Sequence, residues 1–468
     1  MGDLEARTES SLPLTRALGR FVADLTFERL PEAAVSAAGV GITDCVGTMI
    51  AGSVEATVQI LRRTLASGGP GEATLYFSSE RRAAPEAAWI NGTAAHAIDY
   101  DDVGVRGHPS AVLVPAILAE AEALGASGRD MLAAYAAGYE TWAELAEREP
   151  GHQHRKGWHP TGILGPIGAA AACATLRHLD AERATHAIAL AASQSSGIMA
   201  NFGTMTKPFH AGRAAHAGVI SARLPEAGFT ASADALEHPQ GFLSAVSPHG
   251  EADRERAPRA LRREWRLISA VISVKKFPTC YCTHRSIDAM LDLRGRRSID
   301  PAEIGRITVS LSDTHATILR NHDPQTGLAA KFSIEFAMAS AVIAGRVGLG
   351  ELTDAFVRRP DVQALMRKVR VETNEDYDTE ALGASVWDQV RVQLVGGTVL
   401  ESEKVRRARG HASRPLSSAE LFEKFRGCLE AGGSSLDPKP LFDRLQRLEE
   451  VASARELVAP DGSQGAIR

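Results

Sequence analysis

The stretch TMTKPFHAGRAAHAG, from Thr204 to Gly218, combines a cation, a proline and a run of very small residues. Lys207 directly precedes Pro208, and proline is favoured where a helix begins. We therefore expect a helix to start here, with Lys207 at or just before its N-terminus. The alanines and glycines that follow would let its backbone approach other helices closely. The stretch predicts a helix that packs through small side chains and has a cation at or just before its N-terminus.

Two other stretches repeat this arrangement, RGHPSAVLVP from residue 106 and GWHPTGILGP from residue 157. In each a histidine precedes a proline, so His108 and His159 are also expected at helix N-termini. A second proline six residues after the first leaves open a later start or a kink. Helix N-termini carry a partial positive charge and free N–H donors, and cations beside them add to the same field. Convergence of such sites would form a pocket for a substrate with several carboxylates.

The composition is that of an ordinary globular protein, with 468 residues, 44% of them hydrophobic and 23% charged. From about residue 14 to 243 the chain is dominated by Ala, Leu and Gly at helical spacing, which predicts a tightly packed all-helical domain. Only 5% of the residues are aromatic, which fits packing by small side chains. The charged stretch from Glu251 to Trp265 predicts a solvated helix at a domain boundary.

The pattern changes beyond residue 270. Arg306 to Asp313, Val369 to Thr373 and Gln389 to Val405 alternate with period two, which predicts strands. The last of them reads as a hairpin around Gly396 and Gly397. Helical segments lie before and between these strands, at residues 286–294 and 333–345. We therefore expect a mostly α fold with a large all-helical domain over 12–270 and a smaller α+β domain over 271–407, with 408–455 packing back onto the first.

Net charge and cysteine content limit the classes of function that fit this chain. The net charge of −5 offers no global basic field for nucleic acid or anionic lipid. No uninterrupted apolar run reaches the ~18 residues of a membrane span, and the N-terminus lacks the pattern of a secretory signal. The five cysteines are scattered, and the pair Cys280 and Cys282 lacks further thiolates for zinc or an iron–sulfur cluster. These features predict a cytoplasmic protein with reduced thiols and no nucleic-acid or membrane partner.

Candidate acid–base residues are concentrated in HAIDYDDVGVRGHPS, which places Asp99, Asp101, Asp102 and His108 within ten residues. Repulsion among three carboxylates favours a raised pKa for at least one of them, which could then act as a base. Asp101 and Asp102 could equally cap a helix or form ion pairs. His108 and His159 are natural proton donors or acceptors near neutral pH. Histidines among alanines at helical spacing are instead expected to pack within helices: His96, His186 and His216.

Five motifs in order resemble the MmgE/PrpD family: NGTAAHAIDYDD with GHPSAVLVPA, GWHPTGILGPIGAAAA, NFGTMTKPFHAGRAAHAG, VKKFPTCYCTHRSIDA and AAKFSIEFAMASAVIAG. This family includes 2-methylcitrate dehydratase, cis-aconitate decarboxylase and iminodisuccinate epimerase. The resemblance covers about residues 12 to 455. It implies a homodimer with a helical domain, an α+β lid and the site between them. It also implies that no metal and no organic cofactor takes part.

The resemblance assigns roles to individual residues. Asp99, His108 and His159 would be catalytic, and Lys207 and Lys275 would hold carboxylates of the substrate. We add His210, three residues after Lys207, as a candidate substrate-binding residue. The expected activity is a lyase that moves a proton next to a carboxylate of a small di- or tricarboxylic acid, of the 2-methylcitrate dehydratase or cis-aconitate decarboxylase type.

Two departures from the family pattern leave the reaction open. Where the decarboxylase has an aromatic hydroxyl, SDTHATILRN has His315 and Ala316. The segment DDVGVRGHPS is shorter than that of the dehydratase and lacks its tryptophan. Epimerisation of an amino-dicarboxylate is therefore an alternative.

Other classes of function also stay open. GHQHRKGWH brings His152, His154 and His159 together, and with an acidic ligand from residues 99–102 they could form a metal-dependent hydrolase. A catalytically inactive binding protein on the same scaffold is a third possibility. Metal analysis separates the first two classes, and proton–deuterium exchange on candidate acids separates an enzyme from a binder.

Overall fold

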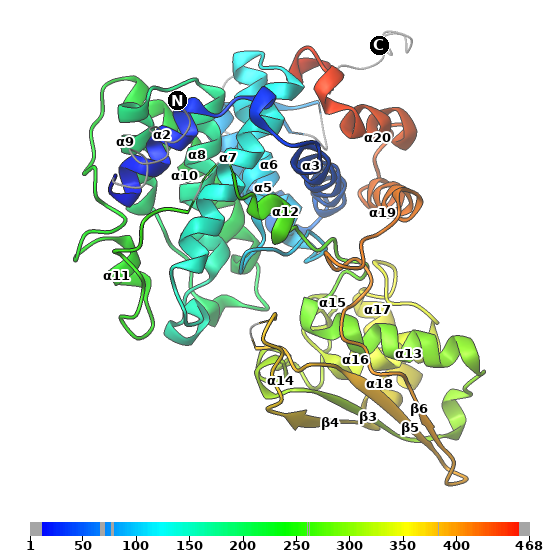
Figure 1. Cartoon of the computed structure of the whole chain (residues 1–468). Coiled ribbons are helices and arrows are strands. Elements are labelled where there is room, and N and C mark those ends of the chain that lie inside the picture. Colours follow the sequence, from blue (N-terminus) through cyan, green and yellow to red (C-terminus); the bar gives the residue numbers. More distant parts are fainter. Residues whose placement is uncertain are drawn as a thin grey trace, which may run out of the picture. The chain divides into compact units, whose positions relative to one another are not determined.

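The computed structural model describes residues 12–65, 71–75, 79–259, 261, 263–381 and 383–457. It divides into two compact units. The helical unit comprises Met1–Ala97, Asp101–Ile272 and Ser418–Arg468, and the mixed unit comprises Ile98–Tyr100 and Ser273–Ser417 (Figure 1). The segment Ile98–Tyr100 thus belongs to the mixed unit, although both of its flanks belong to the helical unit.

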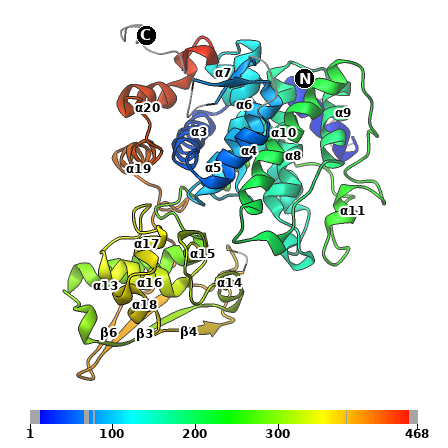
Figure 2. The ribbon, with the colours of Figure 1, turned by 180° about the vertical axis from the view of Figure 1, so that it is seen from behind.

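The helical unit is built around α5 and α10, which contact each other and most of the surrounding helices. Figure 2 shows α4, α5 and α6 side by side, in agreement with their contacts. The helices of the helical unit are α2 (Leu14–Asp24), α3 (Glu32–Gly52), α4 (Ala56–Thr64), α5 (Ala84–Ala97), α6 (Pro109–Leu124), α7 (Gly128–Glu147), α8 (Pro160–Leu176), α9 (Ala181–Ala192), α10 (Thr206–Glu226), α11 (Phe242–Val246), α12 (Arg266–Ser269), α19 (Ser418–Ala431) and α20 (Pro438–Gln446). This unit also contains a two-stranded antiparallel sheet, β1 (Ala73–Thr74) with β2 (Arg81–Arg82), and short 3-10 helices.

Small residues set the distance between α5 and α10, as the sequence predicts. A Cβ atom on Gly212 of α10 would lie 2.2 Å from both Thr93 Oγ1 and the Trp89 carbonyl oxygen of α5. A Cβ on Gly92 of α5 would lie 2.9 Å from the Cα of Gly212. No larger side chain fits between the two backbones. This close approach brings the first turn of α10 next to the last turn of α5.

The expected helix starts are confirmed. α6 begins at Pro109 with His108 as its N-cap residue, and α8 begins at Pro160 with His159 as its N-cap residue. The second proline of each motif lies inside its helix and does not mark the start. α10 begins one residue before Lys207, which therefore lies in the first turn.

The C-terminal helices α19 and α20 both contact α3. A buried ion pair fastens α19 to α3, with 2.6 Å between Lys424 Nζ and Asp44 Oδ1. By length and composition alone α3 could cross a bilayer, a property that it shares with buried core helices, and 67% of its most apolar window is buried. Asp44 interrupts the apolar residues of α3, which therefore contains no uninterrupted apolar run of ~18 residues.

The mixed unit has a four-stranded sheet of order β4-β3-β5-β6. β3 (Ile304–Ser312) pairs in parallel with β4 (Val369–Asn374) and antiparallel with β5 (Gln389–Leu394), which continues into β6 (Val399–Glu401). The helices of this unit are α13 (His284–Arg296), α14 (Asp313–Ile318), α15 (Gly327–Ala330), α16 (Ile334–Ile343), α17 (Asp354–Val357) and α18 (Pro360–Met366). The expected strands, hairpin and intervening helices are confirmed, and one apolar core joins β3, β4 and β5 to α13, α16 and α18.

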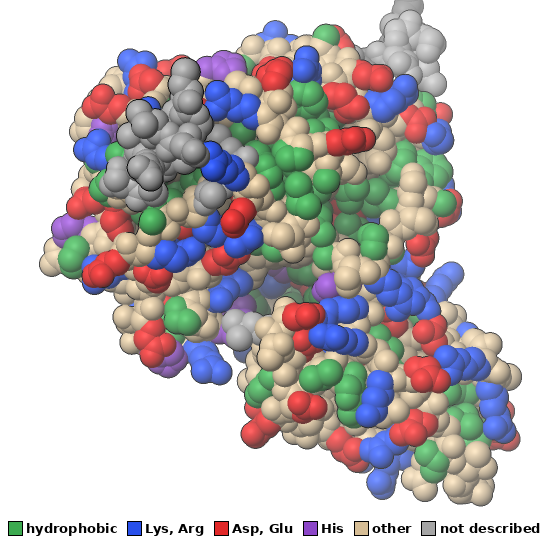
Figure 3. Space-filling model, viewed as in Figure 1, with side chains coloured by type: hydrophobic (Ala, Val, Ile, Leu, Met, Phe, Trp, Pro, Cys, Tyr) green, Lys and Arg blue, Asp and Glu red, His purple; other side chains and the backbone are tan. Residues whose placement is uncertain are grey.

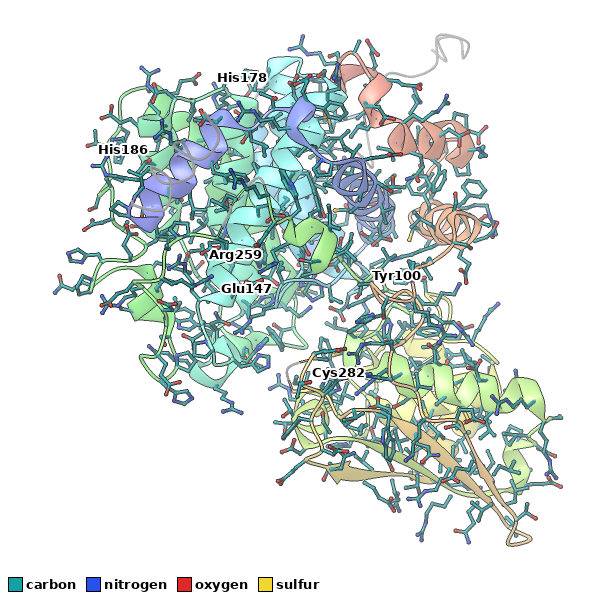
Figure 4. The ribbon with its side chains drawn as sticks, viewed as in Figure 1. Tyr100, Glu147, His178, His186, Arg259 and Cys282 are labelled. Carbon is teal, nitrogen blue, oxygen red and sulfur yellow. The ribbon has the colours of Figure 1, made fainter. Side chains whose placement is uncertain are left out.

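The prediction of a helix over the charged stretch Glu251 to Trp265 is wrong, because its described residues form bends and turns. Pro258 disfavours a helix in the residue before it. Arg256 and Arg259 of this stretch instead reach back to Glu144 of α7. Figure 4 labels Arg259 together with Glu147, with which it also forms an ion pair.

The described surface and thiols agree with the composition. Figure 3 shows Lys and Arg side chains interspersed with Asp and Glu over the visible face, and no area of a single charge dominates it. All five cysteines are free thiols.

Candidate functional site

A buried carboxylate between two histidines forms the centre of the candidate site. His96 lies at the end of α5, and its Nδ1 is 3.0 and 2.9 Å from the two carboxylate oxygens of Asp101. His108 Nδ1 lies 2.9 Å from Asp101 Oδ2. The rings of His96 and His108 are 4.4 Å apart between centroids. One carboxylate thus holds the imidazoles of two different helices.

A tight turn delivers His108 to this carboxylate. Gly104 and Gly107 exchange two backbone hydrogen bonds, and Val105 and Arg106 between them have φ values of 38° and 71°. Left-handed backbone is unfavourable for a valine, and the turn is held by the Trp142 indole, whose Nε1 donates to the Val105 carbonyl at 2.9 Å. The short segment that the sequence shows before its His-Pro motif is therefore a constrained hairpin.

Lys207 reaches the same cluster from α10. Its Nζ lies 2.9 Å from Nε2 of His96, and its side chain is buried, with the ammonium 5.6 Å from the centroid of the Phe202 ring. This contact depends on the close approach of α5 and α10 at Gly92 and Gly212. The small residues and the cation of the TMTKPFHAGRAAHAG stretch therefore serve one arrangement.

Two more histidines continue the cluster. His159 is 2% exposed, its ring stacks at 5.9 Å from that of His96, and its edge meets Phe202 at 4.8 Å. Its Nδ1 lies 3.1 Å from Nδ1 of His210, so one of these nitrogens carries a proton and the other accepts it. Gly197, at φ 121°, passes so close to His210 that a Cβ there would lie 3.0 Å from the ring. The cluster unites His96, His108, His159, His210, Asp101 and Lys207, all within the helical unit.

Burial and the Lys207 charge keep three of these imidazoles neutral, those of His96, His159 and His210. Burial first, then Lys207 and His108, lower the pKa of His96 to about 3 against the opposing pull of Asp101. The pKa of His159 is held well below its usual range by burial and then by Lys207. The same two causes lower the pKa of His210 to about 4. Near neutral pH the site therefore offers imidazole lone pairs in a positive field.

The two adjacent aspartates are driven in opposite directions. Burial alone would raise the pKa of Asp101, but His96 and His108 hold it well below its usual range. Burial, reinforced by the charge of Asp44, raises the pKa of Asp102 well above its usual range. Asp102 hydrogen-bonds Ser110, whose hydroxyl lies 2.7 Å from that of Tyr135. One of the three carboxyl groups does have a raised pKa, and burial is its main cause.

Asp99 and Lys275, two of the predicted site residues, form an ion pair within the mixed unit. Lys275 is 1% exposed and donates from Nζ to the backbone oxygen of Asp99 at 2.8 Å and to its carboxylate at 3.0 Å. Asp99 has φ 55°, a left-handed conformation that aspartate tolerates better than most residues. The two predicted residues are thus brought together, and the ion pair secures the segment that separates α5 from Asp101.

Comparison with known protein families gives a match for each of two parts of the chain. The MmgE/PrpD N-terminal domain matches residues 16–255, and the MmgE/PrpD C-terminal domain matches residues 277–437. The chain belongs to the MmgE/PrpD family. All the residues of the histidine–lysine cluster lie in the N-terminal domain of this family, and Lys275 lies just before the C-terminal one.

Curated relatives of this MmgE/PrpD chain carry one activity in their names. Cis-aconitate decarboxylase of Mus musculus is 28% identical over 356 residues, which cover 73% of this chain and 70% of the relative. The human protein of the same name is 28% identical over 353 residues, covering 73% and 71%. Cis-aconitate decarboxylase of Aspergillus terreus is 22% identical over 473 residues, covering 95% and 96%. These names are consistent with a lyase that acts on a carboxylic acid.

One member of the cluster was interpreted otherwise from the sequence. His96 was expected to be a packing residue because it lies among alanines, yet it bridges Asp101 and Lys207. Asp101 was a candidate base or else a capping or ion-pairing residue, and it forms ion pairs with His96 and His108. The signal that could have found His96 is its spacing, because residue 96 lies four after Gly92 on the face that meets α10. The other two histidines of that group, His186 and His216, lie outside the cluster.

The ligand set proposed for a metal hydrolase does not assemble. Among the described residues, the grouping of His, Cys, Asp or Glu side chains close enough to share a cation is His96, Asp101 and His108. His152 and His154 are not part of it, and their rings are 5.7 Å apart. A cation at the observed grouping would need lone pairs from both Nδ1 atoms, which here point at the Asp101 carboxylate.

The stretch that departs from the family's aromatic hydroxyl lies at the end of β3. Residues 313–318 form α14, capped by Ser312, whose hydroxyl accepts from the His315 amide at 3.1 Å. A phenol does approach this stretch within the mixed unit, because the hydroxyl of Tyr377 donates to Asp313. It comes from the segment after β4, about 60 residues further along the chain.

Proposed function

We propose that this chain is a cofactor-independent lyase that moves a proton at a carbon next to a carboxylate of a small di- or tricarboxylic acid. The observation that carries the proposal is a buried lysine set among four imidazoles, at least three of which are kept neutral. The names of the relatives support decarboxylation of cis-aconitate as the first reaction to test, and dehydration of 2-methylcitrate as the next.

The electrostatics favour an anionic ligand. Lys207 lowers the pKa of several imidazoles around it, so its positive field extends over the cluster. A ligand carboxylate placed there would be held by a charge-assisted contact, worth about 1.5–3 kcal/mol. Its negative charge would also raise the pKa of the neighbouring imidazoles, because the charged form of histidine would gain an opposite charge. Substrate binding would therefore prepare the histidines to take up and hold a proton.

His108 and His159 are the proposed proton-transfer residues. A neutral imidazole can accept a proton from carbon, and an imidazolium, formed in that way or on substrate binding, can give a proton to the carbanion that remains after CO₂ departs. Holding Nδ1 of His108 against Asp101 fixes its tautomer and leaves Nε2 as the basic nitrogen. Lys207 and Lys275 would bind carboxylates and stabilise the negative charge that develops. Asp99 would act through its ion pair with Lys275, and a homodimer in the cytoplasm remains part of the proposal.

A substrate panel tests this function. Purified protein is incubated with cis-aconitate, 2-methylcitrate, citrate and iminodisuccinate, and products are followed by NMR, with and without EDTA. We expect turnover of at least one of these acids that survives EDTA and dialysis. Turnover of none, with a folded protein, would contradict the proposal. Activity lost on chelation and restored by zinc or iron would instead favour a cation held by His96, Asp101 and His108.

A further inference from the structure

We propose that Asp101 and His96 are positioning residues that set the proton positions of His96 and His108 and the orientation of Lys207. In this arrangement Asp101 fixes the tautomers of two histidines, and His96 in turn aims the ammonium of Lys207. The inference rests on the proposed function for its kinetic test, but its structural test does not require any turnover.

The proton positions follow from donors and acceptors alone. His108 Nδ1 lies 2.9 Å from an Asp101 oxygen and 2.8 Å from the Asp102 carbonyl oxygen. Neither oxygen can donate when the Asp101 carboxylate is ionised, so Nδ1 carries the proton. His96 Nδ1 faces both oxygens of the same carboxylate at 2.9–3.0 Å and must also be protonated.

The state of His96 then decides how Lys207 is held. Its Nε2 lies 2.9 Å from the Lys207 ammonium, which can only donate. A doubly protonated His96 would place two donors face to face, so the observed contact requires a neutral ring with its lone pair on Nε2. The result is a continuous chain from the Asp101 carboxylate through a neutral imidazole to the Lys207 ammonium. His96 is 1% exposed, so both contacts lie away from bulk water.

The same carboxylate therefore serves both halves of the proposed chemistry. On one side it orients the base His108, and on the other it supports the residue that aims a carboxylate-binding cation. A single structural element, the segment from 101 to 108 that follows α5, couples proton transfer to substrate binding. Among the described residues, the ion-pair partners of the buried Asp101 carboxylate are His96 and His108, and neither an arginine nor a lysine pairs with it. The coupling gives this carboxylate a role.

A matched pair of variants at His96 separates its two contacts. The amide nitrogen of Asn occupies about the position of Nδ1, and the amide of Gln reaches about the position of Nε2. His96→Asn keeps a donor for Asp101 but loses the acceptor for Lys207, whereas His96→Gln keeps an acceptor for Lys207. We expect KM to rise roughly ten- to hundred-fold in His96→Asn, as for a lost contact to a charged group, and only a few-fold in His96→Gln. Equal KM values in the two variants would overturn the role of His96.

A second pair compares the adjacent aspartates. Asp101→Asn replaces an acceptor of two N–H donors by a group that must turn an N–H toward one of them. Replacing the orienting aspartate of a catalytic triad by Asn costs about 10⁴-fold in kcat, and we expect a loss of roughly 10²–10⁴-fold here. Asp102→Asn should lose less than about tenfold, because the Asp102 side chain contacts Ser110 and an amide oxygen can still accept from that hydroxyl.

The pH profile distinguishes positioning from a merely structural role. Removing the Asp101 charge removes stabilisation of protonated His108, so its pKa should fall and the acidic limb of the kcat/KM profile should move to lower pH. Among the described residues, the titratable groups around His108 that remain include His96, His154, His159 and Asp102, with Lys207 beside His96. A variant that only folds less well would lose activity at every pH without moving the limb, and that result would overturn the role of Asp101.

Nitrogen-15 NMR of histidine-labelled protein tests the inference without any substrate. At pH 7 we expect His96 and His108 to be neutral with the proton on Nδ1, and assignment comes from His96→Gln and His108→Ala. In Asp101→Asn at least one of the two should change tautomer. An imidazolium, or an Nε2–H tautomer, at either position in the parent protein would overturn the inference. If the tautomers are as expected and no acid is turned over, the proposed function fails while this arrangement stands.

Discussion

Two buried polar clusters of the helical unit use charge in opposite ways. In the first, Glu144 of α7 is surrounded by arginines, with 2.8 Å to Arg148 Nη2, 2.7 Å to Arg259 Nε and 3.3 Å to Arg256 Nη2. In the second, Lys207 contacts a neutral imidazole, and the pKa values of the imidazoles around it are lowered.

The difference separates stability from chemistry. The glutamate–arginine cluster compensates its charges by hydrogen-bonded ion pairs, and it anchors a stretch without helix to α7. The histidine–lysine cluster buries an ammonium against neutral imidazoles whose pKa values are lowered, and shifted pKa values in a buried cluster are typical of functional sites. Substitutions in the first cluster should therefore affect unfolding, and substitutions in the second should affect turnover and binding.

The largest effect is expected for the proton-transfer histidines. His108→Ala and His159→Ala should each lower turnover by about 10²–10⁴-fold, the usual range for losing a general acid or base. Steady-state kinetics on the best substrate of the panel measure the loss. The control is His178→Asn, at an exposed position with φ 50° that Asn tolerates; Figure 4 labels His178. Near-normal turnover in a folded His159→Ala protein would remove the proposed mechanism.

The glutamate–arginine cluster should respond in unfolding instead. Glu144→Ala leaves buried guanidinium groups without their carboxylate, so the free energy of unfolding should fall by about 3–5 kcal/mol. Urea titration measures this change. Glu147→Ala, at a side chain 37% exposed, should cost at most about 1 kcal/mol. If the folded Glu144→Ala protein loses turnover as strongly as His159→Ala, the division between the two clusters is wrong.

Lys207 tests the binding half of the comparison. Lys207→Ala should weaken substrate binding roughly ten- to hundred-fold, since one charge-assisted contact is worth about 1.5–3 kcal/mol. Calorimetry or KM reports the change. Lys439→Ala, at an exposed lysine paired with Asp443, should leave binding unchanged. Equal affinity in the parent and in a folded Lys207→Ala protein would show that the ammonium does not hold the substrate.

The smallest effect is a pH dependence of stability. The pKa of His96 is lowered to about 3 and that of His210 to about 4, while in the unfolded chain a histidine has a pKa near 6.5. Between these values the unfolded state binds more protons, so stability is full above about pH 6.5 and falls as the pH drops toward 4, by up to about 1.4 kcal/mol per pH unit for each such histidine. Urea midpoints at pH 7.5 and 5.5 measure it, and the slope should be smaller in His210→Asn. A slope that His210→Asn leaves unchanged would contradict a neutral buried His210.

The sequence predicted the parts of the fold that depend on local pattern. Prolines fixed the starts of α6 and α8, small residues predicted the close packing of α10, and alternation predicted β3, β4 and β5. The stretch from 251 to 265 was mistaken for a helix because its charges suggest a solvated face. Its arginines in fact pair with Glu144, which is more than a hundred residues earlier in the chain, and no local pattern carries that information.

The site was predicted where a motif marks it and missed where geometry makes it. His108, His159 and Lys207 each precede a proline, which predicts the start of a helix. The structure brings these three residues into one cluster with His210. His96 and Asp101 have no such marker. Their importance comes from two helices that meet at Gly92 and Gly212 and from a turn with two left-handed residues, which only the folded arrangement reveals.

Exchange of carbon-bound hydrogen in D₂O tests the central claim most directly, because it detects proton transfer even when net turnover is slow. Cis-aconitate, 2-methylcitrate, citrate and iminodisuccinate are each incubated with the parent protein, His159→Ala and His178→Asn, and deuterium next to a carboxylate is followed by NMR. The account predicts deuterium incorporation into at least one acid or its product, unaffected by EDTA, at similar rates in the parent and His178→Asn and at least about 10²-fold slower in His159→Ala. Incorporation at the same rate in His159→Ala, or none in the parent with any of the four acids, would contradict it.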